Sequence, residues 1–464
     1  MKNLFPISMR STIPGIVWPE IISPMAAQLY YQLAHFDVTE KLPEANIKEF
    51  QFRQLTTLFN FARQFVPYYQ EKFAHLPFIS DWHDLANLWE ELPILTRTDI
   101  QQADSALFAE KVPPGHEPSE LLSTSGSTGH PVTIKGNVAT QFFWNAISLR
   151  NHLWHKDEFN KSFATIRYGF YETAKDNPAA PPQGTSYQHW SPATYAFGET
   201  GTCYHLSFCS VEEEAEWLLR VNPDYLNCNP STLKAIIGYF AQHGKKPDKL
   251  KKVHTHSEIV EPSLRTLVKE ILGISLIDNY SAKETGYIAL QCPESDHYHI
   301  QSENILVEIL NDQGKPCAVN EPGKVIVTPL HNFSSPLIRY QIGDYAIPGE
   351  PCVCGRTLPI LKQVLGRQRN MLHLPDGRQV WPSFANNGVR LMDLFSNRQF
   401  QVVQKSLMEL EVNLTGKHFT SLEEDQLREK LMMIFEHPFN FIFNYVNEIP
   451  RSTGGKFEDF KSEC

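Results

Sequence analysis

The sequence predicts an α/β fold: a large N-terminal domain with parallel sheets and an antiparallel β subdomain, then a small α+β C-terminal domain. Three observations lead to this prediction. Short runs of strand character alternate with amphipathic stretches between about residues 121 and 364, two apolar runs flank a turn-rich segment, and the C-terminal part mixes one strand pattern with one helix pattern. Alternation of strands and helices is typical of parallel sheets covered by helices.

The amphipathic segments are predicted to be helical. LTTLFNFARQFVPYYQEKF carries apolar residues near helical spacing, and VEEEAEWLLRV and EPSLRTLVKEILG follow later in the chain. The glycine that ends the third segment is of the kind that closes a helix. DYLNC and ISLIDNY, which follow the second and third segments, have strand character.

Antiparallel strands and a domain boundary are predicted further along. NILVEIL and GKVIVTPL flank a turn-rich segment, which places an antiparallel subdomain at about residues 290–364. LMELEVNL alternates like a half-buried strand, and Ser421 with Glu424 predicts a capping box that opens a helix. We therefore expect an N-terminal domain over residues 1–366 and a C-terminal domain over residues 367–464.

Composition and charge limit the class of protein. The 464 residues are 42% hydrophobic and 20% charged, which is globular composition, and the net charge of -10 argues against a nucleic-acid binder. Prolines interrupt the N-terminus, so a secretory signal is not expected, and no apolar run is long enough for a bilayer. Eight unevenly spaced cysteines indicate a reduced, cytoplasmic protein rather than a disulfide scaffold. We expect no membrane partner and a monomer or homodimer.

The most informative segment is LLSTSGSTGHPVTI. Its hydroxyl residues and glycines can direct backbone N–H groups and side-chain hydroxyls at an anion such as phosphate. The segment is not a Walker loop, because GxxxxGK[ST] is absent. A flexible Ser/Gly linker is the alternative, but apolar segments lie on both sides. The predicted phosphate ligands are Ser125, Gly126, Ser127, Thr128 and Gly129.

This segment resembles the phosphate-binding loop of acyl-adenylate-forming enzymes, the superfamily of acyl-CoA synthetases and peptide-synthetase adenylation domains. Val132 follows the proline, as in the phenylacetate–CoA ligase branch, whereas many other members of the superfamily have a lysine at this position. HTHSEIV and SLIDNYSAKETG resemble the paired adenine-site motifs, with Tyr280 against the adenine and Glu284 as a ligand for Mg²⁺. The other nucleotide-binding residues that these motifs imply are Ser257, Glu258, Asp278, Asn279 and Ser281.

Three later motifs continue the resemblance in the same order. SPLIRYQIGDY resembles the Arg-Tyr-x-Thr-Gly-Asp motif, which implies that Asp344 binds the ribose hydroxyls; a carboxylate can accept two hydrogen bonds from a diol. CVCGRTLPILKQVLGRQRNML is similar to the hinge region of phenylacetate–CoA ligases, and Arg367 is implied to contact ribose or phosphate. IPRSTGGKFEDF places Lys456 as the catalytic lysine, beside Glu284 and Thr128 in the implied catalytic set.

The resemblance implies an ATP-dependent ligase that activates an aromatic or other small carboxylic acid as acyl-AMP and transfers it to CoA. It also implies a mobile C-terminal lid that rotates between the two half-reactions, with a hinge near Arg369. The residues expected around the acyl group are Phe143, Tyr168 and His256. Transfer to a carrier-protein thiol or an amine is the alternative, and a non-catalytic paralogue is a third reading.

Several features depart from the family pattern, among them Arg369 and Asn370 in place of the hinge acids and Ile342 in place of the threonine before Gly343. Lys283 stands before Glu284, where members usually have Thr or Ser, and this lysine either neutralises phosphate charge or points into solvent. His256 replaces the small glycine of the first adenine-site motif, which favours a shorter or more polar acyl pocket.

The cysteines suggest a structural zinc site. Cys292, His299, Cys352 and Cys354 supply three sulfurs and one imidazole, a set suited to tetrahedral Zn²⁺ that would pin the small antiparallel subdomain. His297 competes with His299 as the imidazole ligand, and four reduced side chains in loops are the alternative.

Overall fold

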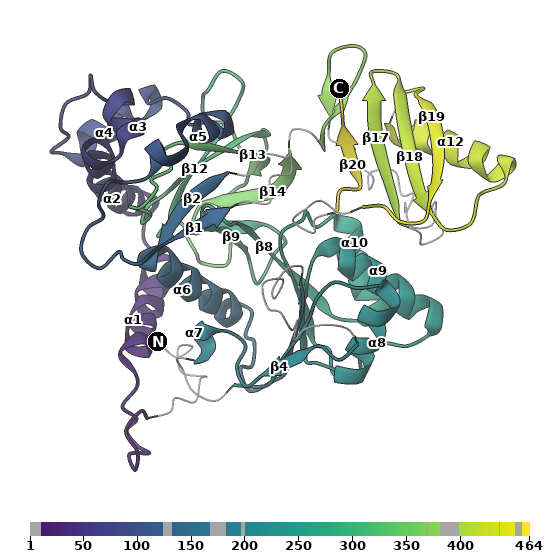
Figure 1. Ribbon diagram of the computed structural model, residues 1–464, viewed down its shortest axis with the longest axis horizontal. Helices are drawn as coiled ribbons and strands as arrows, with labels where there is room; N and C mark the ends of the chain where they lie inside the picture. Colours follow the sequence, from purple (N-terminus) through teal and green to yellow (C-terminus); the bar gives the residue numbers. More distant parts are fainter. Residues whose placement is uncertain are drawn as a thin grey trace. The chain divides into compact units, whose positions relative to one another are not determined.

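The computed structural model describes residues 11–123, 132–167, 182–195, 200–367, 370–380, 399–435, 437–450 and 457–464. The chain divides into two compact units, whose elements are coloured along the sequence in Figure 1. Unit 1 comprises Met1–Phe163, Ser186–Tyr204 and Asp278–Val364. Unit 2 comprises Ala164–Thr185, His205–Ile277 and Leu365–Cys464.

Unit 1 begins with a helical region that follows the predicted pattern. In α2, Leu55, Leu58, Phe59 and Ala62 are all buried, which is the spacing of one helix face. The helices of this unit are α1 (Pro24–Thr39), α2 (Glu44–Phe65), α3 (Pro67–Lys72), α4 (Trp82–Leu88), η1 (Trp89–Glu91), α5 (Arg97–Ala103), η2 (Asp104–Leu107), α6 (Val138–Trp154) and α7 (Pro192–Tyr195).

Antiparallel strand pairs contribute to the core of unit 1 together with its helices. β1 (Ser119–Ser123) and β2 (Thr133–Asn137) form a hairpin. Seven further strands run in the order β11-β12-β13-β14-β10-β9-β8. Their bounds are β8 (Ser275–Ala282), β9 (Gly286–Gln291), β10 (Tyr298–Ile300), β11 (Ile305–Leu310), β12 (Gly323–Pro329), β13 (Tyr340–Pro348) and β14 (Ile360–Arg367). Val307 pairs with Val327, which confirms the antiparallel strands predicted from NILVEIL and GKVIVTPL.

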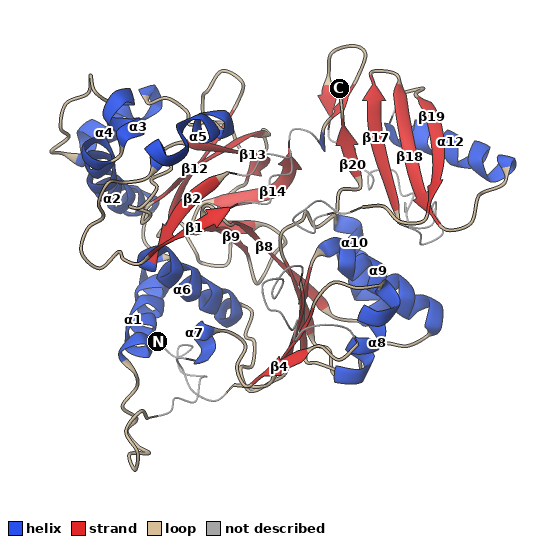
Figure 2. Cartoon of the chain, in the orientation of Figure 1, coloured by secondary structure: helices blue, strands red, loops and turns tan. Residues whose placement is uncertain are grey.

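Unit 2 contains the predicted parallel strands and helices. Leu226 of β6 pairs with Val253 of β7 in parallel register, and Gly273 has a φ of 75° where the predicted helix ends. Figure 2 shows α8, α9 and α10 along one side of these strands. The strands follow the order β7-β6-β3-β5. The elements are α8 (Val211–Val221), β6 (Tyr225–Cys228), α9 (Pro230–His243), β7 (Lys252–Thr255), α10 (Pro262–Leu267), the π-helix η3 (Val268–Leu272), and β3 (Phe163–Ile166) and β5 (Cys203–Leu206), which both begin in unit 1. β4 (Thr185–Tyr187) belongs to unit 1 except for Thr185.

The C-terminal part of unit 2 is a four-stranded sheet in the order β19-β18-β17-β20, with α12 packed on it. Leu410, Val412 and Leu414 of β18 are fully buried between half-buried polar neighbours, which confirms the predicted half-buried strand. The elements are β15 (Leu372–His373), β16 (Gln379–Val380), β17 (Phe400–Ser406), β18 (Glu409–Thr415), α12 (Ser421–Phe435), β19 (Asn440–Val446) and β20 (Phe460–Ser462).

The capping box predicted from Ser421 and Glu424 is wrong by one residue. The Thr420 backbone N–H and hydroxyl both donate to the Glu423 carboxylate, at 2.7 and 2.9 Å, and the Glu423 N–H donates back to the Thr420 hydroxyl. Glu424 instead accepts a hydrogen bond from the Tyr445 hydroxyl at 2.6 Å. Thr420 with Glu423 and Ser421 with Glu424 have the same spacing, so either pair could form a capping box. Because Glu424 binds Tyr445 of β19, the first pair forms it.

None of the helices that the structure describes is both long enough and apolar enough to span a membrane.

Candidate active site

Tyr280 and Asp344 meet inside unit 1. Tyr280 lies on β8 and Asp344 on β13, and the Tyr280 hydroxyl donates to Asp344 Oδ2 at 2.7 Å. Both side chains are half-buried, so the tyrosine ring and the carboxylate each retain a surface for a ligand. A carboxylate accepts several hydrogen bonds, and Asp344 can therefore serve the tyrosine and a diol together.

Lys283 connects the turn after β8 to the hydroxyl-rich segment. Its ammonium group donates to the backbone carbonyl of Ser123 at 2.9 Å. Ser123 is the last residue of β1 and pairs with Thr133 of β2, so the hairpin holds both ends of the segment between them. Glu284 is half-buried in the same turn as Lys283. The lysine therefore places the predicted Mg²⁺ ligand and the base of the predicted phosphate loop in one neighbourhood.

Several predicted residues lie outside the described residues: Ser125, Gly126, Ser127, Thr128, Gly129, Tyr168 and Lys456. Three others lie on β8. The buried Asp278 carboxylate accepts a hydrogen bond from the Tyr298 hydroxyl at 2.7 Å, and Ser281 donates to the Asn279 side chain at 3.3 Å. Asp278 thus supports the sheet beneath Tyr280.

Phe143 lies in a group of partly exposed aromatic side chains. Its ring stacks on the imidazole of His331, with centroids 3.8 Å apart and planes 6° from parallel. Trp144 lies on the same helix α6, and the centroids of the Trp144 and Tyr287 rings are 4.7 Å apart. Tyr287 lies on β9, which follows the turn that contains Glu284. Burial lowers the pKa of His331 to about 3, so the imidazole is neutral at pH 7. The sequence did not reveal His331, because an isolated histidine after a strand carries no recognisable pattern.

Glu258 lies in unit 2 beside the first turn of α9. Its carboxylate accepts hydrogen bonds from the Ser231 N–H at 2.9 Å, the Asn229 amide at 3.2 Å and the Phe457 N–H at 2.8 Å. The preceding residue, Ser257, has a φ of 71°, a left-handed conformation that non-glycine residues rarely adopt and that is frequent at functional sites.

The other two predicted residues of unit 2 are also placed. His256 Nδ1 lies 2.9 Å from the Asn227 side chain, and Arg367 is the last residue of β14. Unit 1 thus joins Tyr280 to Asp344 and also contains Glu284, whereas Ser257, Glu258, His256 and Arg367 belong to unit 2.

A cluster of thiols and imidazoles lies in unit 1 around β10. The donor atoms of Cys292, His297, His299 and Cys352 all lie within 4.8 Å of one another. The Cys292 and Cys352 sulfurs are 3.7 Å apart, and the Cys354 sulfur is 3.3 Å from His299 Nε2. A tetrahedron with Zn–S bonds of about 2.3 Å has sulfurs about 3.8 Å apart, so the cluster has the dimensions of a zinc site.

In both imidazoles Nδ1 has a partner other than a sulfur, which leaves Nε2 for a metal ion. His299 Nδ1 faces the Leu358 carbonyl at 3.4 Å, and His297 Nδ1 faces the Ser295 hydroxyl at 2.9 Å. Among the described residues, buried His297 Nε2 has no hydrogen-bond partner. Burial lowers the pKa of both histidines, that of His299 to about 3, which keeps them neutral as metal ligands must be.

Arg356 links the cluster to a buried charge network. Its guanidinium donates to the Cys354 sulfur at 3.5 Å, pairs with Glu40 at 3.3 Å and lies over the Trp154 ring. Burial opposes ionisation of Cys354, but hydrogen bonds from Arg356 bring the pKa of this thiol below its ordinary value. Arg150 pairs with the same Glu40 at 3.1 Å.

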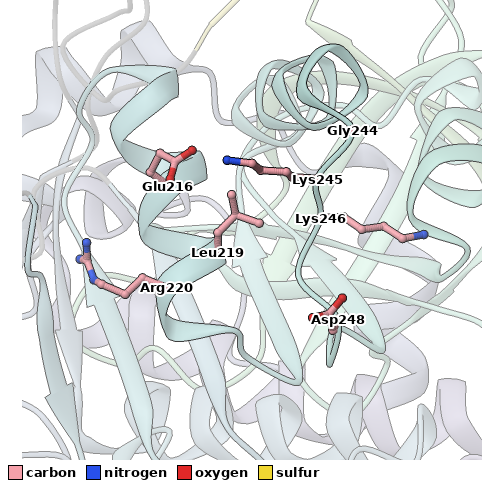
Figure 3. Close-up of a pocket in the computed structure, with 7 residues that line it drawn as sticks. All are labelled: Glu216, Leu219, Arg220, Gly244, Lys245, Lys246 and Asp248. Atoms are coloured by element: carbon pink, nitrogen blue, oxygen red, sulfur yellow. The ribbon is translucent and has the colours of Figure 1, made fainter.

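A depression on the surface of unit 2 lies apart from these residues in the sequence. Figure 3 shows Glu216 and Lys245 facing one another there, with basic and acidic side chains around them. Its lining residues are Glu216, Leu219, Arg220, Gly244, Lys245, Lys246 and Asp248. These differ from the residues that the sequence predicted for the site, and their mixed charges identify no ligand class.

Comparisons with known proteins agree with the motifs. A family model described as the CapK C-terminal domain matches residues 375–463. Phenylacetate–coenzyme A ligase of Thermus thermophilus is 24% identical over 363 residues, which covers 74% of this chain and 75% of that protein. The resemblance to the phenylacetate–CoA ligase branch is thereby confirmed.

Solved structures share the fold. A 2-hydroxyisobutyryl-CoA ligase in the postadenylation state, in complex with 2-HIB-AMP, matches with a TM-score of 0.71 at 17% identity, covering 91% of each chain. An amide bond synthetase from Marinactinospora thermotolerans matches with a TM-score of 0.50 at 15% identity, covering 76% of this chain and 71% of that one. The predicted α/β fold class is confirmed, whereas the domain boundary at residue 367 stays a prediction.

Proposed function

We propose that this homologue of phenylacetate–CoA ligase is an ATP-dependent, AMP-forming acid–thiol ligase. The observation that carries the proposal is the meeting of three motif segments in unit 1. The Tyr280–Asp344 hydrogen bond and the Lys283–Ser123 hydrogen bond bring the adenine motif, the ribose motif and the base of the hydroxyl-rich loop to one place. Likeness to a CoA ligase in sequence and to an acyl-AMP complex in fold supports the same activity.

The first half-reaction joins the acid to AMP. A carboxylate oxygen attacks the α-phosphorus of ATP, the bond to the bridging oxygen breaks, and pyrophosphate leaves. Tyr280 would lie against the adenine and Asp344 would hold the ribose hydroxyls. Ser125–Gly129 would bind the outer phosphates, and Lys456 would offer positive charge to both substrates. Glu284 has the chemistry of an Mg²⁺ ligand, and Mg²⁺ would neutralise phosphate charge there.

The second half-reaction transfers the acyl group to a thiol. The CoA sulfur attacks the acyl carbonyl carbon, the bond to the AMP oxygen breaks, and AMP leaves with the electron pair. The aromatic group around Phe143 supports an aromatic acid within the predicted class of aromatic or other small carboxylic acids, because flat rings stack on such side chains. A carrier-protein thiol or an amine is the alternative acceptor, and the likeness in fold to an amide bond synthetase gives it support.

Exchange of labelled pyrophosphate into ATP tests the first half-reaction. We expect exchange to depend on a carboxylic acid and to fall severely in Lys456→Ala. Lys461→Ala is the matched control, since Lys461 lies in the same terminal segment but pairs with Glu463 at 2.8 Å. No exchange with any acid of a broad panel would refute the proposal, and adding CoA, a carrier protein or amines to the acyl-AMP identifies the acceptor.

We also propose a structural Zn²⁺ held by Cys292, His299, Cys352 and Cys354, with His297 as the competing ligand. The sulfur spacing, the contact between His299 Nε2 and the Cys354 sulfur, and the buried His297 Nε2 that has no hydrogen-bond partner among the described residues support it. Elemental analysis of unchelated protein should find about one zinc per chain. Cys292→Ala should lose it and Cys317→Ala, outside the cluster, should keep it. The zinc content of His297→Gln compared with that of Cys354→Ser identifies the fourth ligand. Wild-type protein without zinc would refute the site.

A reduced, cytoplasmic setting and a monomeric or homodimeric state stay predictions. The sparse and uneven spacing of the eight cysteines is the basis for the reduced setting.

A further inference from the structure

One face of α1 is apolar and exposed to solvent. The opposite face of the helix is buried where α1 packs on α6. The exposed face carries an apolar stripe with the spacing i, i+4, i+7 and i+11, formed by Ala27, Tyr31, Ala34 and Val38. The exposed fraction is 72% for Tyr31 and 59% for Val38. Asp37 is the only charged residue of the helix, and a helix that is apolar on all sides is normally covered on all sides.

The spacing of this stripe fits a pair of helices. Alternating steps of four and three residues are those of the positions that meet in a coiled coil. When two copies of one helix pair antiparallel about a two-fold axis, the numbers of the residues that face each other have a constant sum. With the axis at the middle of the stripe, Ala27 faces Val38 of the second copy and Tyr31 faces Ala34 of the second copy. Each contact joins a small side chain to a larger one, so the two helices can approach closely without leaving a void.

A loop that precedes α1 is a second exposed apolar feature. The Thr12 N–H and hydroxyl donate to the Ile21 carbonyl at 2.8 and 2.9 Å, and the Ile21 N–H donates to the Ser11 hydroxyl at 3.3 Å. These hydrogen bonds close the loop at its base. Between them lie Val17 and Trp18, with exposed fractions of 82% and 83%. Exposed apolar surface of this kind marks interaction sites.

The area and the charge of the loop and the stripe favour a second copy of this chain over a membrane. An interface of standard size buries about 800 Å² per partner. The exposed side chains of the loop and the stripe offer a comparable area, since Trp and Tyr alone contribute about 150 to 250 Å² each. Helices that lie on membranes are rich in Lys and Arg, whereas residues 11–38 contain neither and include Glu20 and Asp37.

We propose that this chain forms a two-fold symmetric dimer in which α1 pairs antiparallel with α1 of a second copy. Ala27 packs against Val38 of the second copy, and Tyr31 packs against Ala34. Because the helices are antiparallel, the loop with Trp18 lies toward the C-terminal end of the partner helix. The dimer needs no substrate, so its test does not depend on the proposed function.

Sedimentation velocity over a range of protein concentrations tests the dimer. Wild type should sediment as a dimer. Tyr31→Ala should raise the dissociation constant roughly tenfold or more, because aromatic side chains at the centre of an interface carry much of the binding energy. Phe78→Ala is the matched control, since Phe78 is 69% exposed, like Tyr31, but lies outside the loop and the stripe. This variant should dimerise as wild type does.

Exchanging side chains between Tyr31 and Ala34 tests the register of the pair. Ala34→Tyr should weaken the dimer, because Tyr then faces Tyr at both contacts. The double variant Tyr31→Ala with Ala34→Tyr again has one small and one large side chain at each contact. It should dimerise more tightly than either single variant, and such a rescue also shows that the single variants had not merely failed to fold.

Cysteine cross-linking tests the same register. Ala27→Cys combined with Val38→Cys should give covalent dimers under mild oxidation, and a reductant should separate them. Neither single variant should cross-link beyond the wild-type level. In this register each of the two positions lies about 16 Å along the helix from its own counterpart, which is too far for a disulfide.

Three outcomes overturn the proposal. Wild type that stays monomeric at tens of micromolar concentration refutes the dimer. A dimer that both Tyr31→Ala and Ala34→Tyr leave unchanged is formed by another surface. Monomeric wild type that floats with phosphatidylcholine vesicles, and loses this binding in Trp18→Ser, assigns the loop and the stripe to a membrane instead.

Discussion

Replacing Tyr280 with phenylalanine tests how the candidate site holds the ribose. The variant keeps the ring face that would lie against adenine and removes only the hydroxyl that donates to Asp344 Oδ2 at 2.7 Å. Without that donor the Asp344 carboxylate loses the contact that fixes its orientation on β13. We therefore expect ATP to bind more weakly while the acid binds as before.

The magnitude follows from the type of bond and its exposure. A hydrogen bond to a charged group contributes about 1.5 to 3 kcal/mol, and the half-buried position of both partners places this one near the lower limit. A loss of about 1.4 kcal/mol corresponds to a tenfold change in binding. The KM for ATP should therefore rise about tenfold in Tyr280→Phe. Tyr280→Leu also removes the ring face, which is worth about another 1 to 3 kcal/mol.

The assay is pyrophosphate exchange at varied ATP concentration, with 2′-deoxy-ATP measured in parallel. Wild type should prefer ATP over 2′-deoxy-ATP, and this preference should shrink in Tyr280→Phe, because a poorly oriented Asp344 gains less from the missing hydroxyl. A variant with the KM and nucleotide preference of wild type would show that the hydrogen bond has no part in ribose binding.

Three further changes have expected outcomes. Arg150→Met leaves the buried carboxylate of Glu303 without its cation and removes one of the two cations that pair with Glu40, so denaturant unfolding should show a loss of about 3 to 5 kcal/mol. Burial opposes ionisation of Glu303, but Arg150 lowers the pKa of this carboxyl in the folded chain. The contribution of this ion pair to folding stability is therefore present above the ordinary glutamate pKa and is lost as pH falls through the lowered pKa. Denaturant unfolding at several acidic pH values measures this loss. Lys283→Met should raise the KM for ATP in the exchange assay, because the carbonyl at the base of the loop loses its partner. Phe143→Ala should raise the KM for aromatic acids about three- to tenfold more than for ATP, and equal effects would place the ring elsewhere than in the acyl site.

Features set by local periodicity could be predicted from the sequence. The alternation of Leu410, Val412 and Leu414 defines β18, and the helical spacing of Leu55 and Leu58 defines the buried face of α2. These features depend on neighbours a few residues away, so a single sequence contains the needed information. The capping box failed by one residue because Tyr445, on a distant strand, binds Glu424.

Contacts between distant segments could not be predicted. No spacing rule relates Lys283 to the carbonyl of Ser123, or Glu258 to the N–H of Phe457, because both contacts depend on how strands and turns pack. The cysteine cluster was partly predictable, since sulfur and imidazole have a recognisable chemistry. The place of His297 was not predictable, because its donor atom lies within 4.8 Å of those of Cys292, His299 and Cys352, whereas the predicted ligand set held Cys354 in its place.

Arg356 couples two features that are far apart in the sequence. One guanidinium touches a sulfur of the thiol cluster and the carboxylate of Glu40, at the end of α1, while lying over Trp154. Removal of a metal ion from those sulfurs by a chelator would change the charge on the sulfur that Arg356 contacts. The contact between Arg356 and Glu40, at the end of α1, would change with it. Protein purified with strong chelators should therefore show altered tryptophan emission and easier proteolysis near residue 40. Protein preparations that differ in metal content would then differ in the stability of α1, a helix that supplies none of the proposed metal ligands.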